Sequence, residues 1–396
     1  MNCGSDKVIY MDNNATTRVA PEVIDAMMPF LTDCYGNPSS MHTFGGQVGQ
    51  SINEARQSIA ELIGAEPEEI VFTSCGTESD STAILSALQT WPEKRHVVTT
   101  RVEHPAVKNL CENLDGLTGH KHRITRLQVE ADGTLNLDQY RESLSDDTAI
   151  VSVMWANNET GVIFPVEKMA AIARERGILF HTDAVQAVGK IPINLKESCI
   201  DFLSISGHKL HAPKGIGVLY IRKRTPFIPF LNGGHQEHGR RGGTENVASI
   251  VGLGHACQLA AAKMTEENTR VRALRDKLES GLLTKIPRSL LNGHKTERLP
   301  NTANISFEYV EGEAILLHMN RYQICASSGS ACTSGSLEPS HVLRAMGVPF
   351  TAAHGSIRFS LSVYNTEAEV DFVLDKMPAI IENLRAMSPF WSEANK

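Results

Sequence analysis

A repeated alternation of short β-branched runs, polar loops and amphipathic stretches, over residues 69 to 221, most restricts the fold of this chain. Such alternation predicts an α/β fold with a mainly parallel sheet. The range 166–176 places apolar residues on one helical face, between Pro165 and Gly177 as helix boundaries, which indicates a βαβ crossover. We expect strands at 70–73, 96–100, 123–129, 148–154, 178–182, 202–206 and 217–221.

A second, smaller α+β unit is expected after the sheet. A long helical pattern runs over residues 247–285, and beyond it lie strand-like pieces at 303–307 and 356–360 and a terminal helix at 367–384. With 396 residues, the chain exceeds one ordinary hydrophobic core. We therefore predict a large domain over residues 15–260 and a small domain formed by residues 1–14 and 261–396.

Composition excludes several classes of partner. The net charge of -7 and the pI near 6.1 leave no basic excess for nucleic acid or an anionic membrane. Residues 1–7 show no secretion signal, and no apolar stretch approaches the ~18 residues of a membrane span. The eight cysteines form no CxxC pair. We expect a soluble, cytoplasmic protein without structural disulfides, whose partners are small molecules and proteins.

Polar residues follow four of the predicted strands. Ligands of open α/β sheets bind where the strands reach their carboxyl edge, so these positions are candidates for a site. The segment 74–79 follows the first strand and opens a helix, whose free N–H groups suit a phosphate. The other three positions carry His104 after a Glu-His-Pro turn, Asp183, and Lys209 after a Ser-Gly-His turn.

Each of these signals has an ordinary alternative when taken alone. The segment around Gly76 and Thr77 could be a plain helix cap, Asp183 a helix N-cap, and Lys209 a solvated surface residue. Together, however, they supply a lysine for a Schiff base, an acid for a pyridine nitrogen and a cradle for a phosphate. The combination predicts a pyridoxal-phosphate site.

The chain resembles cysteine desulfurases of the class V aminotransferase superfamily, of the NifS type, which are pyridoxal-phosphate enzymes of fold type I. The most specific matching segment is Ser-Ser-Gly-Ser-Ala-Cys-Thr-Ser-Gly at 327–335. The segment 233–246 resembles the NifS type more than the housekeeping type. Further matching segments lie at 10–17, 36–40, 77–80, 157–161, 183–186, 206–209 and 356–360.

The resemblance implies a role for each matching residue. Lys209 would be the Schiff-base lysine, Asp183 the partner of the pyridine nitrogen, and Cys332 the sulfur acceptor. His104 would stack on the cofactor ring and take part in catalysis, and Arg358 would bind the substrate carboxylate. The other implied contacts are Gln186 and Asn158 near the phenolic oxygen, Asn158 also near the substrate, Gly76, Thr77, Ser206 and His208 at the phosphate, and Thr244 reaching the phosphate from a second subunit.

The implied activity converts L-cysteine to L-alanine and leaves the sulfur on Cys332 as a persulfide. A homodimer would then deliver it to an iron–sulfur scaffold protein, for nitrogen fixation, and Cys332 would contact the iron–sulfur cluster during transfer. Seven of the nine residues at 327–335 are Ser, Gly or Ala, so we expect a mobile loop. Cys325 follows the strand-like run 322–324, which would bury it and raise its pKa.

Two alternatives remain open at this stage. One is another enzyme of the same fold, either a selenocysteine lyase or another pyridoxal-phosphate lyase or aminotransferase. Release of alanine and sulfide from cysteine without a keto acid distinguishes these from the desulfurase. The other is a catalytically silent scaffold, against which the joint presence of Lys209, Asp183, Cys332 and Arg358 argues.

Overall fold

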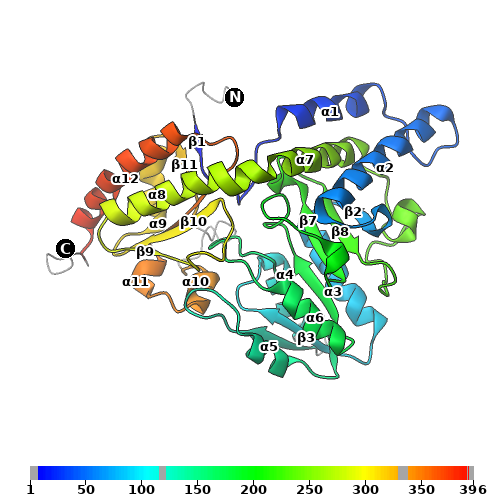
Figure 1. Ribbon diagram of the computed structural model, residues 1–396, viewed down its shortest axis with the longest axis horizontal. Coiled ribbons are helices and arrows are strands. Elements are labelled where there is room, and N and C mark those ends of the chain that lie inside the picture. Colours follow the sequence, from blue (N-terminus) through cyan, green and yellow to red (C-terminus); the bar gives the residue numbers. More distant parts are fainter. Residues whose placement is uncertain (1–7, 116–121, 329–337, 390, 392–396) are drawn as a thin grey trace.

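The computed structural model describes residues 8–115, 122–328, 338–389 and 391. It has a mixed α/β architecture in which a large body and a smaller one are joined along one long helix (Figure 1). The fold class expected from the sequence is confirmed. Residues 329–337 lie outside the described residues, and they include Cys332 and most of the Ser/Gly segment 327–335.

The large body is built on a seven-stranded sheet of order β2-β8-β7-β6-β5-β3-β4. Only β8 runs antiparallel to its neighbours, so the other six strands share one carboxyl edge. Six of the strands are buried on both faces, as their β-branched sequences predict. The strands are Ile70–Thr73 (β2), His96–Thr100 (β3), Arg123–Leu127 (β4), Thr148–Ser152 (β5), Leu179–Asp183 (β6), Phe202–Ser206 (β7) and Gly217–Ile221 (β8).

Helices cover both faces of this sheet. Neighbouring residues such as Val71 and Phe72 point to opposite faces and join different hydrophobic clusters. One cluster contains residues of α3 and α4, and the other contains residues of α2, α6 and α7. The helices of this body are Pro21–Thr32 (α1), Thr43–Ile63 (α2), Gly76–Thr90 (α3), Pro105–Leu114 (α4), Leu137–Ser143 (α5), Val166–Glu175 (α6) and Val247–Glu266 (α7).

The long helix spans Val247–Lys285 and crosses from one body to the other (Figure 1). It comprises α7, a π-helical turn over Glu267–Val271, and α8 over Arg272–Lys285. Its length and composition would suffice to cross a membrane, contrary to the expectation that no segment would, and 44% of the apolar window is buried inside the fold. Leu253 and Cys257 lie in the main core, so packing accounts for this apolar character.

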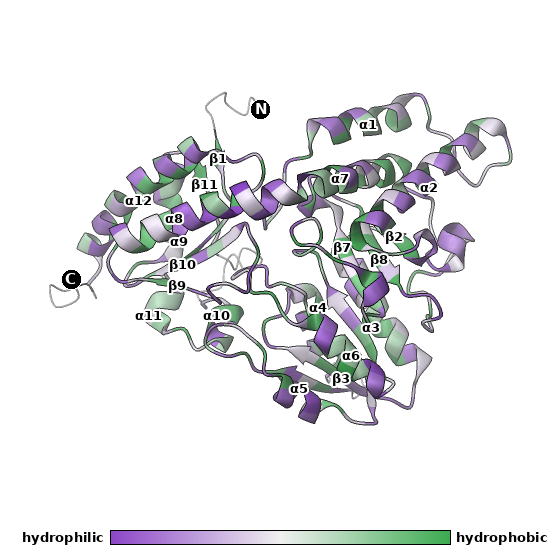
Figure 2. Ribbon diagram, in the orientation of Figure 1, coloured by the Kyte–Doolittle hydropathy of each residue, from purple (hydrophilic) through white to green (hydrophobic). Residues whose placement is uncertain are grey.

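The small body has a core of its own, which combines both ends of the chain. Ile9 and Met11 pack with apolar residues of α8 and α12. Figure 2 shows hydrophobic and hydrophilic turns alternating along α12, as expected of a helix with one face on a core. The elements are Ile9–Tyr10 (β1) paired with Ile324–Cys325 (β11), the sheet Ser289–Leu291 (β9), Thr302–Phe307 (β10) and Ser356–Ser360 (β12), and helices Gly312–Asn320 (α9), His341–Ala345 (α10), Phe350–Ala353 (α11) and Glu367–Met387 (α12).

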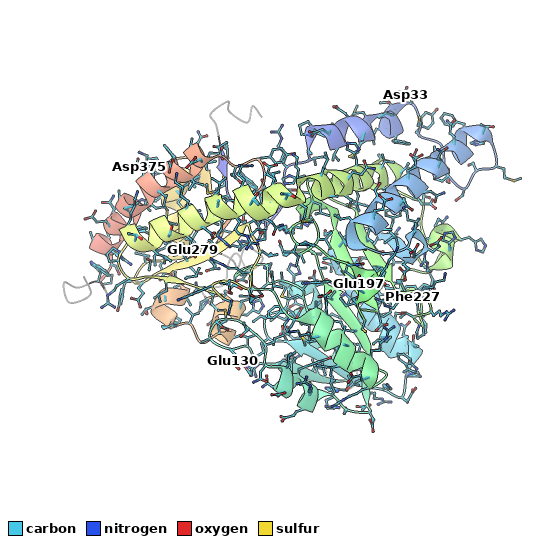
Figure 3. The ribbon with its side chains drawn as sticks, viewed as in Figure 1. Asp33, Glu130, Glu197, Phe227, Glu279 and Asp375 are labelled. Atoms are coloured by element: carbon cyan, nitrogen blue, oxygen red, sulfur yellow. The ribbon has the colours of Figure 1, made fainter. Side chains whose placement is uncertain are left out.

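An ion pair between a buried arginine and a partly buried glutamate ties α8 to the loop before β10. Glu279, which lies on α8 (Figure 3), places its carboxylate 2.6 Å from Arg298 Nη1. Next to this arginine, the Glu297 carbonyl accepts a hydrogen bond from the Ile163 N–H of the large body. The same loop is therefore anchored to both bodies.

Most predicted elements are confirmed, and the differences at their ends have physical causes. The strand expected at 148–154 ends at Ser152, because the Met154 N–H donates to the Glu103 carboxylate rather than to a strand. The strand expected at 123–129 ends at Leu127, since Val129 forms an isolated bridge with Leu135. Asp183, expected just after a strand, is the last residue of β6.

We predict that the contact between α2 and α7 tolerates no side chain at Gly254. A Cβ there would lie 2.5 Å from Ala55 Cα, so Gly254→Ala should force the helices apart and cost about 1 to 3 kcal/mol of unfolding free energy. In Gly46→Ala, on exposed α2 backbone with nothing within 4 Å, stability should rise by up to about 1 kcal/mol. Thermal denaturation of both variants measures this, and equal stability in the two would contradict the packing.

Candidate active site

A cavity of about 290 Å³ lies at the carboxyl edge of the central sheet. Its wall combines residues that follow β2, β3, β5, β6 and β7 with residues from the chain start and from β12 of the small body. The cavity brings together ten of the residues that the sequence singled out: Gly76, Thr77, His104, Asn158, Asp183, Gln186, Ser206, His208, Lys209 and Arg358.

Lys209 ends the short helical turn Gly207–Lys209 that follows β7. Gly207 is required in this turn, because a Cβ there would lie 2.7 Å from Ile216 Cγ2. Lys209 Nζ donates hydrogen bonds to two backbone carbonyls, Asn14 O at 2.5 Å and Ala15 O at 2.6 Å. Burial, followed by the charge of Arg358, lowers the pKa of the amine to about 7. The uncharged, nucleophilic form of the amine is thus accessible near neutral pH.

Asp183 is buried at the end of β6, and its carboxylate accepts a hydrogen bond from the Val185 N–H at 2.9 Å. Burial raises the pKa of Asp183, an effect that the charges of His104 and Lys209 oppose. A cation placed beside this carboxylate would be stabilised strongly, because no bulk water screens the interaction.

A buried polar layer lies behind Asp183. Asp80 of α3 is fully buried, and its pKa is raised well above the usual range by burial and then by the charge of Asp183. His181 Nε2 lies 3.5 Å from Asp80 Oδ1 and 3.0 Å from Ser204 Oγ. His181 Nδ1 lies 2.8 Å from Ser152 Oγ, and burial lowers the pKa of this histidine to about 3. This layer places a neutral imidazole and a carboxyl with a raised pKa behind Asp183.

Another part of the cavity wall is formed by the N-terminus of α3. Gly76 opens this helix, and a Cβ at this position would lie 3.0 Å from Val185 Cγ2 and 3.5 Å from Ser206 Cβ. The missing side chain therefore leaves room for a ligand to approach the backbone. His208, whose pKa burial lowers to about 4, faces Thr16 through Nδ1 at 3.1 Å. Free N–H groups at such a helix start favour an anion.

Arg358, on β12, brings a cation from the small body into the cavity. Its Nη1 donates to Asn158 O at 2.9 Å, and its Nη2 pairs with Asp12 Oδ1 at 2.8 Å. Its Nε is buried and has no hydrogen-bond partner among the described residues. A buried guanidinium donor without a partner is costly, and a carboxylate ligand would satisfy it.

His104 caps α4, where its Nδ1 accepts a hydrogen bond from the Ala106 N–H at 3.2 Å. Burial lowers the pKa of this histidine and so favours the neutral ring, which would suit stacking. Thr244 is not in this cavity but lines a separate one with Thr73, Ser74 and Arg241. Cys332, the remaining predicted site residue, lies outside the described residues.

Cys325 is only half-buried, which corrects part of the sequence interpretation. The expected strand over 322–324 is reduced to Ile324–Cys325, because Gln323 adopts a left-handed backbone with φ of 56°. The pKa of Cys325 is nevertheless raised, by burial and then by the charge of Asp12. Its thiolate is disfavoured for the expected reason, although the side chain is less enclosed.

Sequence reasoning assigned no role to Asp12 and Asp80, although both lie in segments used for the resemblance. Asp12 follows β1 and pairs with Arg358, which is 346 positions away in the sequence. Asp80 lies on the face of α3 that is buried against the sheet. A carboxylate inside an otherwise apolar helical face was the available signal for Asp80, since buried acids are rare unless they have a function.

Comparison with known proteins extends over both bodies of the fold. A model of the aminotransferase class-V family matches residues 9–373. Cysteine desulfurase NifS of Azotobacter vinelandii is 62% identical over 387 residues, which cover 97% of this chain and 95% of the relative. A cysteine desulfurase of Gluconacetobacter diazotrophicus is also 62% identical, over 98% of this chain and 96% of the relative.

Solved structures agree with these sequence relatives. A NifS-like protein superposes with a TM-score of 0.89 at 38% identity, and the match covers 96% of this chain and 100% of the other. A structure described as SspA in complex with cysteine has a TM-score of 0.78 at 34% identity, over 90% of this chain and 100% of the other. The similarity therefore includes the arrangement of the elements that form the cavity.

We predict that Lys209 reacts as a neutral amine near pH 7 in the cofactor-free protein. Acetylation of each lysine, followed by mass spectrometry over a pH series, measures the midpoint, which should be about 7 for Lys209. The exposed Lys196 serves as control, because its hydrogen bond to Glu66 raises its pKa above 10.5. A Lys209 midpoint as high as that of Lys196 would contradict the burial of the amine.

Proposed function

Because this chain belongs to the class-V aminotransferase family, as a cysteine desulfurase, we propose that its cavity holds pyridoxal 5′-phosphate and acts on L-cysteine. The observation that carries this proposal is that Lys209, Asp183 and Arg358 line one cavity. These are an amine with a lowered pKa, a buried carboxylate and a guanidinium with an unsatisfied donor. No other described cavity combines the three groups.

The residues of the cavity fit this cofactor. The space above Gly76, which a Cβ would fill, and the start of α3 suit a phosphate, with Thr77, Ser206 and His208 beside them. Asp183 would face the ring nitrogen, Gln186 and Asn158 the phenolic oxygen, and His104 the ring face. When bound, the cofactor supplies an electron-withdrawing ring that weakens the bonds at the substrate Cα.

The protein residues then bind the substrate and move its protons. Arg358 offers its free Nε to the substrate carboxylate, while Asp12 and the Asn158 carbonyl hold the other guanidinium nitrogens. Lys209 Nζ, with a pKa near 7, is suited both to take a proton from the substrate Cα and to return one. A negative charge on Asp183, which the charges of His104 and Lys209 favour, would in turn favour a protonated ring nitrogen.

Sulfur transfer requires a thiolate acceptor, and we assign this role to Cys332. Its sulfur attacks the substrate sulfur, so that a sulfur–sulfur bond forms as the carbon–sulfur bond breaks. Cysteine and the Cys332 thiol thereby become alanine and a Cys332 persulfide, with no external oxidant. An iron–sulfur scaffold protein would take the sulfur next, with Cys332 contacting the growing cluster, in the cytoplasm and in the service of nitrogen fixation.

A homodimer is the assembly that we propose. The apolar side chains of Ile24, Met28 and Leu31 lie on one face of α1 and are 45%, 47% and 60% exposed. An exposed apolar helical face of this kind indicates a partner surface. Thr244 lies away from the cavity of its own chain, as expected of a residue that serves the site of a second copy.

We predict that Cys332 alone carries the sulfur. Brief exposure of the holoenzyme to L-cysteine should add one sulfur atom to Cys332 in mass spectra. Cys332→Ala should reduce sulfide release by at least about a hundredfold, as for loss of a nucleophile, while the cofactor absorbance stays. In the matched control Cys325→Ala, activity should change less than about twofold, because its thiol has a raised pKa. Undiminished activity in Cys332→Ala would overturn the assignment.

We predict that the solution particle contains two 43.3-kDa chains that associate through α1. Met28→Glu combined with Leu31→Glu should convert it to a monomer, because two charges would have to be buried in the interface. Leu317→Glu on α9, which is 69% exposed, serves as control and should leave the dimer intact. Light scattering after size exclusion measures the mass, and a monomeric wild-type protein would refute the dimer.

A further inference from the structure

The π-helical turn Glu267–Val271 interrupts the long helix where it passes behind the active site. Such turns are rare and are often found at functional positions. Asn268 Nδ2, within this turn, donates a hydrogen bond to the Lys190 carbonyl at 2.8 Å. Glu267 and Lys190 also line one small cavity of about 60 Å³, together with Lys209. The mechanism described above uses neither Glu267 nor Lys190.

Lys190 is buried, with 7% of its surface exposed. A series of hydrogen bonds begins at its side chain. Its Nζ donates to both oxygens of Gln186, the backbone O and the side-chain Oε1, each at 3.1 Å. Gln186 Nε2 in turn donates to Asn14 O at 3.0 Å. The same Asn14 carbonyl accepts from Lys209 Nζ at 2.5 Å. The buried Lys190 and the partly buried Lys209 are therefore joined through one glutamine and one carbonyl.

We propose that Lys190 is a positioning residue of the desulfurase, which fixes the Gln186 amide and the Asn14 carbonyl and holds a buried positive charge near Lys209. This inference rests on the role of Lys209 proposed above. It extends the active site to the π-helical turn, which connects the large body to the small body that carries Arg358.

The orientation of Gln186 follows from donor and acceptor chemistry. An ammonium group has only hydrogen-bond donors, so Lys190 faces the amide oxygen and leaves the NH₂ group for Asn14 O. Without a donor at position 190, the amide loses one of the two contacts that fix its orientation. The other contact is the Asn14 carbonyl, which repels the oxygen of a flipped amide. Lys190 and the Asn14 carbonyl therefore set the orientation of the Gln186 amide together.

The charge of Lys190 acts on Lys209 as well. Burial lowers the pKa of Lys190 to about 8, and the nearby Glu267 carboxylate opposes this effect. After burial and Arg358, Lys190 is the next cause of the low pKa of Lys209. The other charged or titratable groups that act on the two lysines are Asp12, Asp183, His104, His208 and His211.

The test measures the amine of Lys209 directly in the cofactor-free protein. Acetylation of Lys209, quantified by mass spectrometry over a pH series, is compared in wild type, Lys190→Met and Lys190→Arg. Removal of the like charge in Lys190→Met should shift the Lys209 midpoint upward by about one pH unit. Lys190→Arg keeps the charge and should leave the midpoint near that of wild type. Lys196→Met removes an exposed lysine charge and should also change nothing.

Two outcomes would overturn the inference. One is a Lys190→Met protein with a native circular dichroism spectrum and an unshifted Lys209 midpoint. The other is an equal shift in Lys190→Arg, which would mean that altered packing rather than charge moves Lys209. Should Lys190→Met alone fail to fold because Glu267 is left unpaired, Lys190→Met/Glu267→Met removes both charges and should show the same upward shift.

The two proposals fail separately in this experiment. The acetylation assay contains neither cofactor nor cysteine, so its result does not depend on sulfur transfer to Cys332. A chain that forms no persulfide would contradict the proposed function, but the effect of Lys190→Met on the Lys209 midpoint could still be measured. A chain that forms the persulfide and shows no shift in Lys190→Met would contradict only the role of Lys190.

Discussion

The segment 9–17 is the constraint on which the rest of the active site depends. Its first residues, Ile9 and Met11, belong to the core of the small body. A few residues later, the carbonyls of Asn14 and Ala15 hold the Lys209 amine, and Thr17 is hydrogen-bonded to the His208 carbonyl through both its N–H and its hydroxyl. The segment that packs into the core of the small body therefore also positions the Lys209 amine.

Burial has opposite consequences for the acids and the bases around this segment. It lowers the pKa of Lys209 to about 7 and that of His181 to about 3, whereas it raises those of Asp183 and Asp80. Each shift makes the neutral form more accessible than it would be in water. Of these groups, Lys209 has a pKa close enough to neutral pH to exchange protons there.

The sequence was sufficient to predict the residues at the rim of the cavity, because strand ends can be located from local patterns. Lys209, Asp183 and His104 follow recognisable β-branched runs, and the parallel connection of those runs brings them to one edge. Local patterns do not reveal pairings between distant segments. Asp12 with Arg358 and Asn268 with Lys190 depend on how the two bodies meet, which hydropathy does not encode. The π-helical turn likewise left no sign in the helical periodicity of residues 247–285.

The antiparallel direction of strand β8 restricts which residue can occupy its first position. Because β8 runs against its neighbours, it begins, rather than ends, beneath the turn that precedes α3. At its first residue, Gly217, a Cβ would lie 2.7 Å from the Cys75 carbonyl carbon. Any larger residue would displace the backbone that leads into Gly76. Descendants of this protein that change substrate can thus vary the cavity walls, while position 217 stays glycine for as long as the turn before α3 is kept.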